Sequence, residues 1–124
     1  MSATYDYLQK CKSALIATNV FTSVAVGLER GIGAKDAPFA RIVPISHKPS
    51  GVGTALRFQV VFGFDTKNKD YEILHSQYFD TEESIVKAIQ RTGAKWENTV
   101  TDEDAVLNLK TAVIIFTNED IQCS

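Results

Sequence analysis

Large apolar residues alternate with other residues along one stretch in the middle of the chain, Ala55 to Asp65. Side chains of a β-strand point to opposite faces in turn, so this period of two predicts a strand with one strongly apolar face. That face carries five residues, Leu56, Phe58, Val60, Phe62 and Phe64. Burying all five contributes on the order of 10 kcal/mol. The face therefore requires cover from helices or from a second sheet.

An amphipathic helix is predicted over Thr4 to Thr18, because Leu8, Cys11 and Leu15 recur at helical spacing. This helix is a candidate cover for the sheet. Cys11 is interpreted as a small core residue, since the two cysteines of the chain show neither metal-binding spacing nor a disulfide framework.

Two strands are predicted between this helix and the central one. Val20 to Leu28 and Phe39 to Ile45 are rich in β-branched and aromatic residues. Glu29 to Pro38 is predicted to be a loop, and Ser46 to Gly53 a long turn-rich connection between two hairpin strands. Pro44 lacks a backbone donor, so it is expected at the sheet edge or at the end of its strand.

After the central strand, Tyr71 to Phe79 is predicted to be a strand that pairs antiparallel with it, because the polar link between them is short. A helix is then predicted to begin at Asp80, with Glu83 reaching back in a capping box, and to end at Gly93. Adjacent helix positions diverge, so Glu82 and Glu83 indicate a helix start rather than a catalytic pair.

The last third of the chain carries a weaker pattern. Trp96 is expected to anchor its segment on the core, and Thr101 to Asp104 to form a polar turn or a short helix. Lys110 to Thr117 is predicted to be a central strand covered on both faces, because its apolar run is continuous. The residues after Asn118 are expected to form a loose tail.

Assembled, these elements predict an α+β fold: a mainly antiparallel four- to five-stranded sheet with two helices packed on one face, in the order α-β-β-β-β-α-β. The length of 124 residues suits one domain over residues 1–124. No apolar run reaches the roughly 18 residues of a membrane span, and no signal peptide is recognisable, so a cytosolic site of synthesis is expected.

The net charge of −2 is unevenly distributed. Residues 1–64 carry seven basic against three acidic residues, whereas residues 65–124 carry six against twelve. A solvated surface can divide in this way by chance, but a subunit with a positive and a negative side can also meet copies of itself head to tail. The basic residues are scattered and not interleaved with aromatics, which gives no indication of nucleic-acid recognition.

Candidate catalytic groups are few. Gly27, Gly31 and Gly33 lack the spacing of a nucleotide-binding loop. His47 has no carboxylate or second histidine near it in sequence, and His75 is interpreted as structural. No nucleophile motif or metal-binding spacing is present, so the sequence does not indicate an enzyme.

The order of these elements, together with the segments APFARIVP (Ala37 to Pro44) and RFQVVFGF (Arg57 to Phe64), resembles the small tail-terminator, or tail-completion, proteins of tailed bacteriophages. Asp36 to Pro38 is the most recognisable short piece. The resemblance implies a virion protein, assembled in the host cytoplasm, that forms a hexameric ring on the tail tube, stops tube growth and meets the head connector. It also implies that no cofactor, metal or catalytic residue is needed.

In such a ring, basic residues on the two predicted loops and on the strand between them are expected to contact acidic surfaces of a neighbouring subunit or partner. The candidates are Arg30, Lys35, Arg41, His47 and Lys48. Two alternatives remain open at this point. The first alternative is a head-closure or connector protein of the phage neck. The second is a small ligand-binding or catalytic domain with a pocket lined by His75 or Tyr78.

Overall fold

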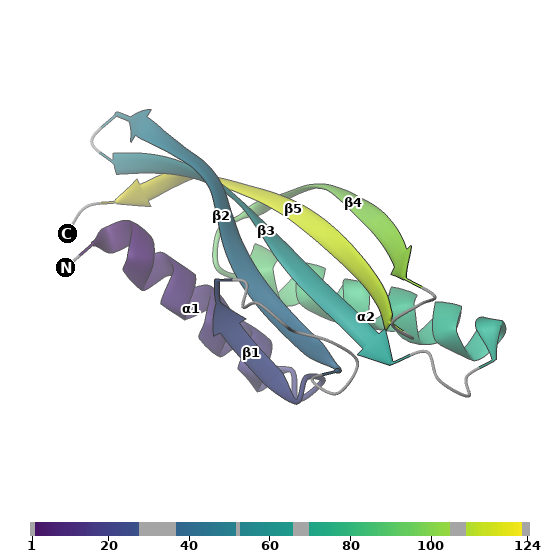
Figure 1. Cartoon of the computed structure of the whole chain (residues 1–124). Coiled ribbons are helices and arrows are strands. Elements are labelled where there is room, and N and C mark those ends of the chain that lie inside the picture. The colour runs from purple at the N-terminus through teal and green to yellow at the C-terminus, as the bar shows by residue number, and fades with distance from the viewer. Residues whose placement is uncertain (1, 28–36, 52, 66–69, 105–108, 123–124) are drawn as a thin grey trace.

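The computed structural model describes residues 2–27, 37–51, 53–65, 70–104 and 109–122. These contain α1 (Ala3–Ala17), β1 (Ser23–Val26), β2 (Phe39–Ser50), β3 (Gly53–Asp65), α2 (Tyr71–Gln90), β4 (Lys95–Asp104) and β5 (Leu109–Gln122). The strands form one sheet in the order β1-β2-β3-β5-β4. Both helices lie on the same side of this sheet (Figure 1). The α+β class predicted from the sequence is confirmed.

The predicted apolar face of β3 is the centre of the core. Its five large side chains are at most 1% exposed, and they pack in one cluster with buried residues of both helices and of β2 and β5. Aromatic rings join the layers: Phe58 stacks on Phe116 of β5 with centroids 5.5 Å apart, and Phe62 stacks on Tyr78 of α2 at 5.7 Å. β3 therefore ties the two helices to the middle of the sheet.

The first helix forms close to the predicted bounds. Leu8, Cys11 and Leu15 are buried as expected from their spacing. The helix begins where the side chain of Ser2 accepts a hydrogen bond from the backbone N–H of Tyr5, and the chain leaves the helical conformation at Asn19, whose φ is 58°.

A hydroxyl pair connects α1 to the end of α2. Thr92 donates its hydroxyl hydrogen to the carbonyl of Ile89 at 2.6 Å, so Tyr7 donates to the Thr92 oxygen, also at 2.6 Å. Because the Tyr7 side chain is buried, this bond satisfies a hydroxyl that would otherwise lose its water partner.

The expectation of a mainly antiparallel sheet needs one correction: the sheet is mixed, because β1 pairs parallel with β2. Ser23 lies opposite Phe39 and Val26 opposite Ile42. The other three pairings are antiparallel. The element order is also different from the predicted one, since it is α-β-β-β-α-β-β.

The predicted strand over Tyr71 to Phe79 is wrong. These residues form the first half of α2, which begins after Asp70 and runs without a break through the expected helix start at Asp80. The side chain of Asp70 accepts a hydrogen bond from the N–H of Glu72 and is the true cap. The aromatic and β-branched content of the segment favoured a strand, but burial of one helical face against β3 outweighs that weak preference.

The segment after α2 forms a strand that the sequence pattern did not predict. Thr101 to Asp104, expected as a turn or short helix, belongs to β4 at the edge of the sheet. Trp96 was expected to anchor this segment on the core, but its side chain is 44% exposed, so that expectation is wrong. Its indole N–H donates to the hydroxyl of Thr99 at 3.1 Å. An edge strand with polar residues shows little alternation, which is why the pattern missed it.

The closing strand is longer than predicted, and the elements that the structure describes cover it on one face only. β5 lies between β3 and β4, which confirms its central position. Ala112, Ile114 and Phe116 are buried, whereas the residues between them are partly exposed. The expected tail after Asn118 is wrong as well, because β5 continues to Gln122 with Ile121 buried.

The connection predicted over Ser46 to Gly53 is mostly strand. β2 continues to Ser50 and pairs with β3 around a tight turn that includes Gly51, whose φ of 60° suits glycine. Pro44 lies beyond the last residue of β2 that pairs with β1, at a register shift in the pairing with β3. The expectation that Pro44 lies at a sheet edge is confirmed, because its missing donor then breaks no ladder on that side.

Gly63 permits a close approach across the sheet. A Cβ atom at this position would lie 2.7 Å from two ring atoms of Phe39, its cross-strand partner, and 3.3 Å from the Thr111 methyl group. The Phe39 side chain is 1% exposed, so the ring has little room to shift. We therefore expect Gly63→Ala to lower the free energy of unfolding by about 1–3 kcal/mol, measured by urea denaturation.

The control for this prediction is the same change in a Phe39→Ala background, where the ring is absent. There Gly63→Ala should lower the free energy of unfolding much less. The effects of the two substitutions are then not additive in a double-mutant cycle. An equal cost of Gly63→Ala in both backgrounds would show that the ring is not the obstacle.

Candidate assembly surfaces

The side of the sheet opposite the helices carries an aliphatic patch that no described element covers. This open face consists of Val43, Val61, Val100, Val113 and Ile115. Val61, Val113 and Val100 are direct cross-strand neighbours on β3, β5 and β4. Val100 is 52% exposed and the others are partly exposed. A contiguous apolar patch of this kind is typical of a contact with another macromolecule.

A second surface is the end of the β2–β3 hairpin. We call residues 44–51 and 53–57 the hairpin arm. β1 pairs with β2 only as far as Ile42, so the outer edge of β2 in the arm pairs with no described strand. The β2 side of the arm is exposed from Pro44 to Pro49. It presents His47 and Lys48, two of the predicted contact residues, on opposite faces of the ribbon, because successive residues of a strand alternate.

A depression of about 260 Å³ lies at the base of the arm, next to the end of β5. Lys48, Arg57 and Glu119 are among the residues that line it. The Arg57 Nε atom donates to a carboxylate oxygen of Glu97 on β4 at 2.9 Å, and this hydrogen bond holds the pKa of Glu97 below its ordinary value. Both side chains are well exposed, so the pair contributes little to stability.

The remaining predicted contact residues do not join this surface. Arg41 is only 3% exposed. Its guanidinium donates to the backbone carbonyl and the hydroxyl of Ser23 at 3.1 and 2.9 Å, and it lies 5.8 Å from the centre of the Phe39 ring. Arg41 therefore holds β1 against β2 within the subunit and is not available to a partner in this conformation. Arg30 and Lys35 lie outside the described residues.

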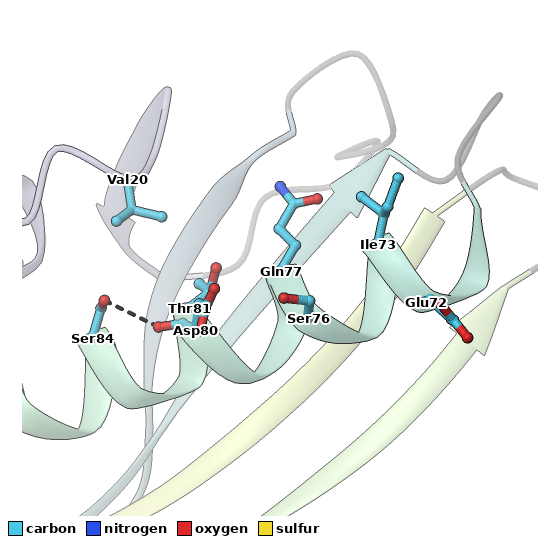
Figure 2. A pocket seen from close by; sticks show the side chains of 8 residues that line it. All are labelled: Val20, Glu72, Ile73, Ser76, Gln77, Asp80, Thr81 and Ser84. Atoms are coloured by element: carbon cyan, nitrogen blue, oxygen red, sulfur yellow. Dashed lines mark hydrogen bonds between the residues drawn. The ribbon is translucent and has the colours of Figure 1, made fainter.

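The third surface is a groove of about 560 Å³ along the first half of α2 (Figure 2). Val20, which precedes β1, faces the helix across the groove. On α2 the groove is lined by Glu72, Ile73, Ser76, Gln77 and Asp80, and further along by Thr81 and Ser84. We call it the α2 groove.

The walls of the α2 groove combine apolar and acidic groups. The Ile73 side chain is 62% exposed, so it adds apolar surface to the groove wall. The carboxylates of Glu72 and Asp80 are both exposed. The Ser84 hydroxyl donates to the backbone carbonyl of Asp80 at 3.1 Å, which leaves the Asp80 carboxylate oxygens to other partners (Figure 2). The groove thus offers an acidic site beside an apolar contact.

The sequence did not reveal this groove, because the predicted strand over Tyr71 to Phe79 would place Glu72 on a sheet, while Asp80 would begin a separate helix. A signal was present nevertheless. Leu74, Tyr78, Thr81 and Ile85 follow one another at spacings of three or four, and all four are buried in α2. That spacing is typical of one helix face, and it puts the groove residues on a neighbouring face.

The two residues suggested for a ligand pocket both lie on α2. His75 is exposed on α2. Tyr78 is 3% exposed, packs against Phe62, and donates its hydroxyl hydrogen to a carboxylate oxygen of Glu82 at 3.2 Å. Neither lines the α2 groove. Glu83 forms an ion pair with Lys87 one turn further along, so Glu82 and Glu83 do diverge as expected of adjacent helix positions.

Among the side chains that the structure describes, no three of His, Cys, Asp or Glu gather closely enough to hold a metal ion. No helix within the described ranges is long and apolar enough to cross a membrane.

Comparison with models of known protein families finds no match to the chain, and comparison with curated proteins finds no relative with significant sequence similarity. The candidate surfaces must therefore be argued from their own geometry.

Burial of the Tyr78 hydroxyl, together with the nearby Glu82 carboxylate, raises the pKa of Tyr78 from 10.0 to about 12. Between these values the unfolded chain loses the phenolic proton while the folded chain keeps it. The stabilising contribution is therefore fully present below pH 10 and is lost as the pH rises towards 12. We expect urea denaturation to show a smaller loss of stability from pH 9 to pH 11.5 in Tyr78→Phe than in the original protein.

Tyr7→Phe provides a second variant with the same expected direction, since burial also raises the pKa of Tyr7. The prediction concerns how steeply the free energy of unfolding changes with pH, because removing either hydroxyl also removes a hydrogen bond at every pH. Parallel slopes for all three proteins would contradict it.

Proposed function

We propose that this chain is a structural protein of a tailed bacteriophage, a tail terminator that forms a ring on the end of the tail tube and joins it to the head connector. The observation that carries the proposal is the one-sided sheet: helices cover one face, while the aliphatic residues of the open face have no cover from the described elements. A subunit that works alone gains nothing from such a face, whereas an assembling subunit buries it against a partner.

The segments that carry the family resemblance support the same reading. Ala37 to Pro44 contributes the first half of β2, and Arg57 to Phe64 contributes most of β3. The two segments pair with each other in the sheet, with Ala40 opposite Phe62 and Ile42 opposite Val60. The resemblance therefore concerns a contiguous part of the sheet, and that part supplies two residues of the open face, Val43 and Val61.

A terminator acts by binding alone. A tail tube grows because each added ring offers the same surface as the ring beneath it. A ring of a different chain that fits the tube on one side and another partner on the other side ends this repetition. Such a ring needs a rigid subunit, a head-to-tail contact between copies, and two further surfaces for unlike partners. The open face, the hairpin arm and the α2 groove supply surfaces for these contacts, and no cofactor enters the proposal.

The test uses purified protein and tail tubes assembled from the tail-tube protein of the same phage. We expect the protein to bind one end of each tube as a ring in electron micrographs, and native mass spectrometry of the released ring to give six copies. Tubes that polymerise in its presence should be shorter, because capped ends add no further subunits.

Binding to the head connector without binding to tubes would favour a head-closure protein of the neck instead. Binding to neither, with a small molecule retained in the α2 groove, would overturn the assembly function in favour of a ligand-binding domain.

A further inference from the structure

The hairpin arm and the α2 groove lie at opposite ends of the molecule. In Figure 1 the β2–β3 turn is at the end where α1 begins and β5 finishes, whereas α2 begins at the other end. The arm of a subunit therefore cannot enter its own groove. A contact between the arm of one copy and the groove of the next is heterologous, so it repeats from subunit to subunit and closes into a ring when the rotation allows.

The two surfaces are complementary in chemistry. The arm presents exposed His47 and Lys48 together with Ile45, which is 41% exposed at the register shift of β2. The groove presents the carboxylates of Glu72 and Asp80 beside the exposed Ile73. Bringing them together pairs a cation with acids and covers two isoleucines that are otherwise exposed to water.

The exposed edge of the arm disfavours the simplest alternative contact, which is the pairing of another strand along that edge. A bare strand edge invites another strand to pair with it, but prolines and lysines on the edge oppose such pairing. Pro44 and Pro49 lack the N–H that a new ladder would use, and Lys48 lies between them. The arm is therefore better suited to insert side chains into a groove than to extend a sheet.

We propose that the hairpin arm of one copy of this chain docks in the α2 groove of the next copy, with Lys48 paired to Asp80 and with Ile45 packed near Ile73. The inference rests on the proposed function, since it specifies the contact that would hold the ring together. It identifies the occupant of the groove as a second copy of this chain.

Charge reversal tests this contact. Lys48→Glu and Asp80→Lys should each weaken self-association by roughly tenfold or more, because each places like charges in the contact. The double variant Lys48→Glu, Asp80→Lys should recover most of the loss, since the pair is restored with its signs exchanged. Association is measured by sedimentation equilibrium at low and moderate salt, and ring formation by electron microscopy with tail tubes present.

Matched controls are available on the same chain. Glu83→Lys makes the same charge change as Asp80→Lys on the same helix, outside the groove, and Lys10→Glu does so for Lys48 on the exposed side of α1. Both controls should leave association within about twofold of the original protein. Circular dichroism checks that each variant is folded.

The outcomes separate this inference from the proposed function. If the original protein forms rings and all reversals leave them unchanged, the docking contact is wrong while the terminator proposal stands. If the reversals and their rescue behave as expected but tubes are never capped, the contact stands and the terminator proposal falls. If Asp80→Lys weakens binding only to a different basic partner, the groove has another occupant and the inference is overturned.

Discussion

Everything in this molecule depends on the burial of one face of β3. Five large side chains at alternate positions are removed from water, and they are the surface on which α1, α2 and the neighbouring strands are packed. At about 25 cal/mol per Å² of apolar surface, the burial of these side chains is a large driving force for folding. The stacked rings of Phe58 with Phe116 and of Phe62 with Tyr78 then set where β5 and α2 lie relative to that face.

The same arrangement creates the surfaces that we propose are functional. Both helices are used to cover one side of the sheet, so the aliphatic residues on the other side have no cover from the elements that the structure describes. β1 is too short to protect the whole of β2, and the hairpin arm extends past it with an exposed edge. The α2 groove arises because the first half of the second helix projects Ile73 and its acidic neighbours away from the core. The surfaces proposed for assembly are thus a consequence of how the core is distributed.

Prediction from the sequence succeeded where one face of an element is deeply buried. β3 and α1 were recognised because their apolar spacing records a single dominant burial direction. It failed for the first half of α2, where aromatic content suggested a strand although Leu74 and Tyr78 follow a helical period. It also failed for β4 and for the far part of the arm, which are exposed and carry no alternation to read. Of the candidate contact residues, only His47 and Lys48 lie on an exposed described surface, because Arg41 is used inside the subunit.

The sequence by itself determined the α+β class, the central strand, the first helix and the unequal distribution of charge, because these follow from local spacing and composition. Only the tertiary structure decided that β1 runs parallel to β2, that Arg41 is buried, and that the arm and the α2 groove lie at opposite ends. Those features depend on which distant segments meet. Local spacing shows which side of an element seeks burial, but the partner it finds is decided by the packing of the whole chain.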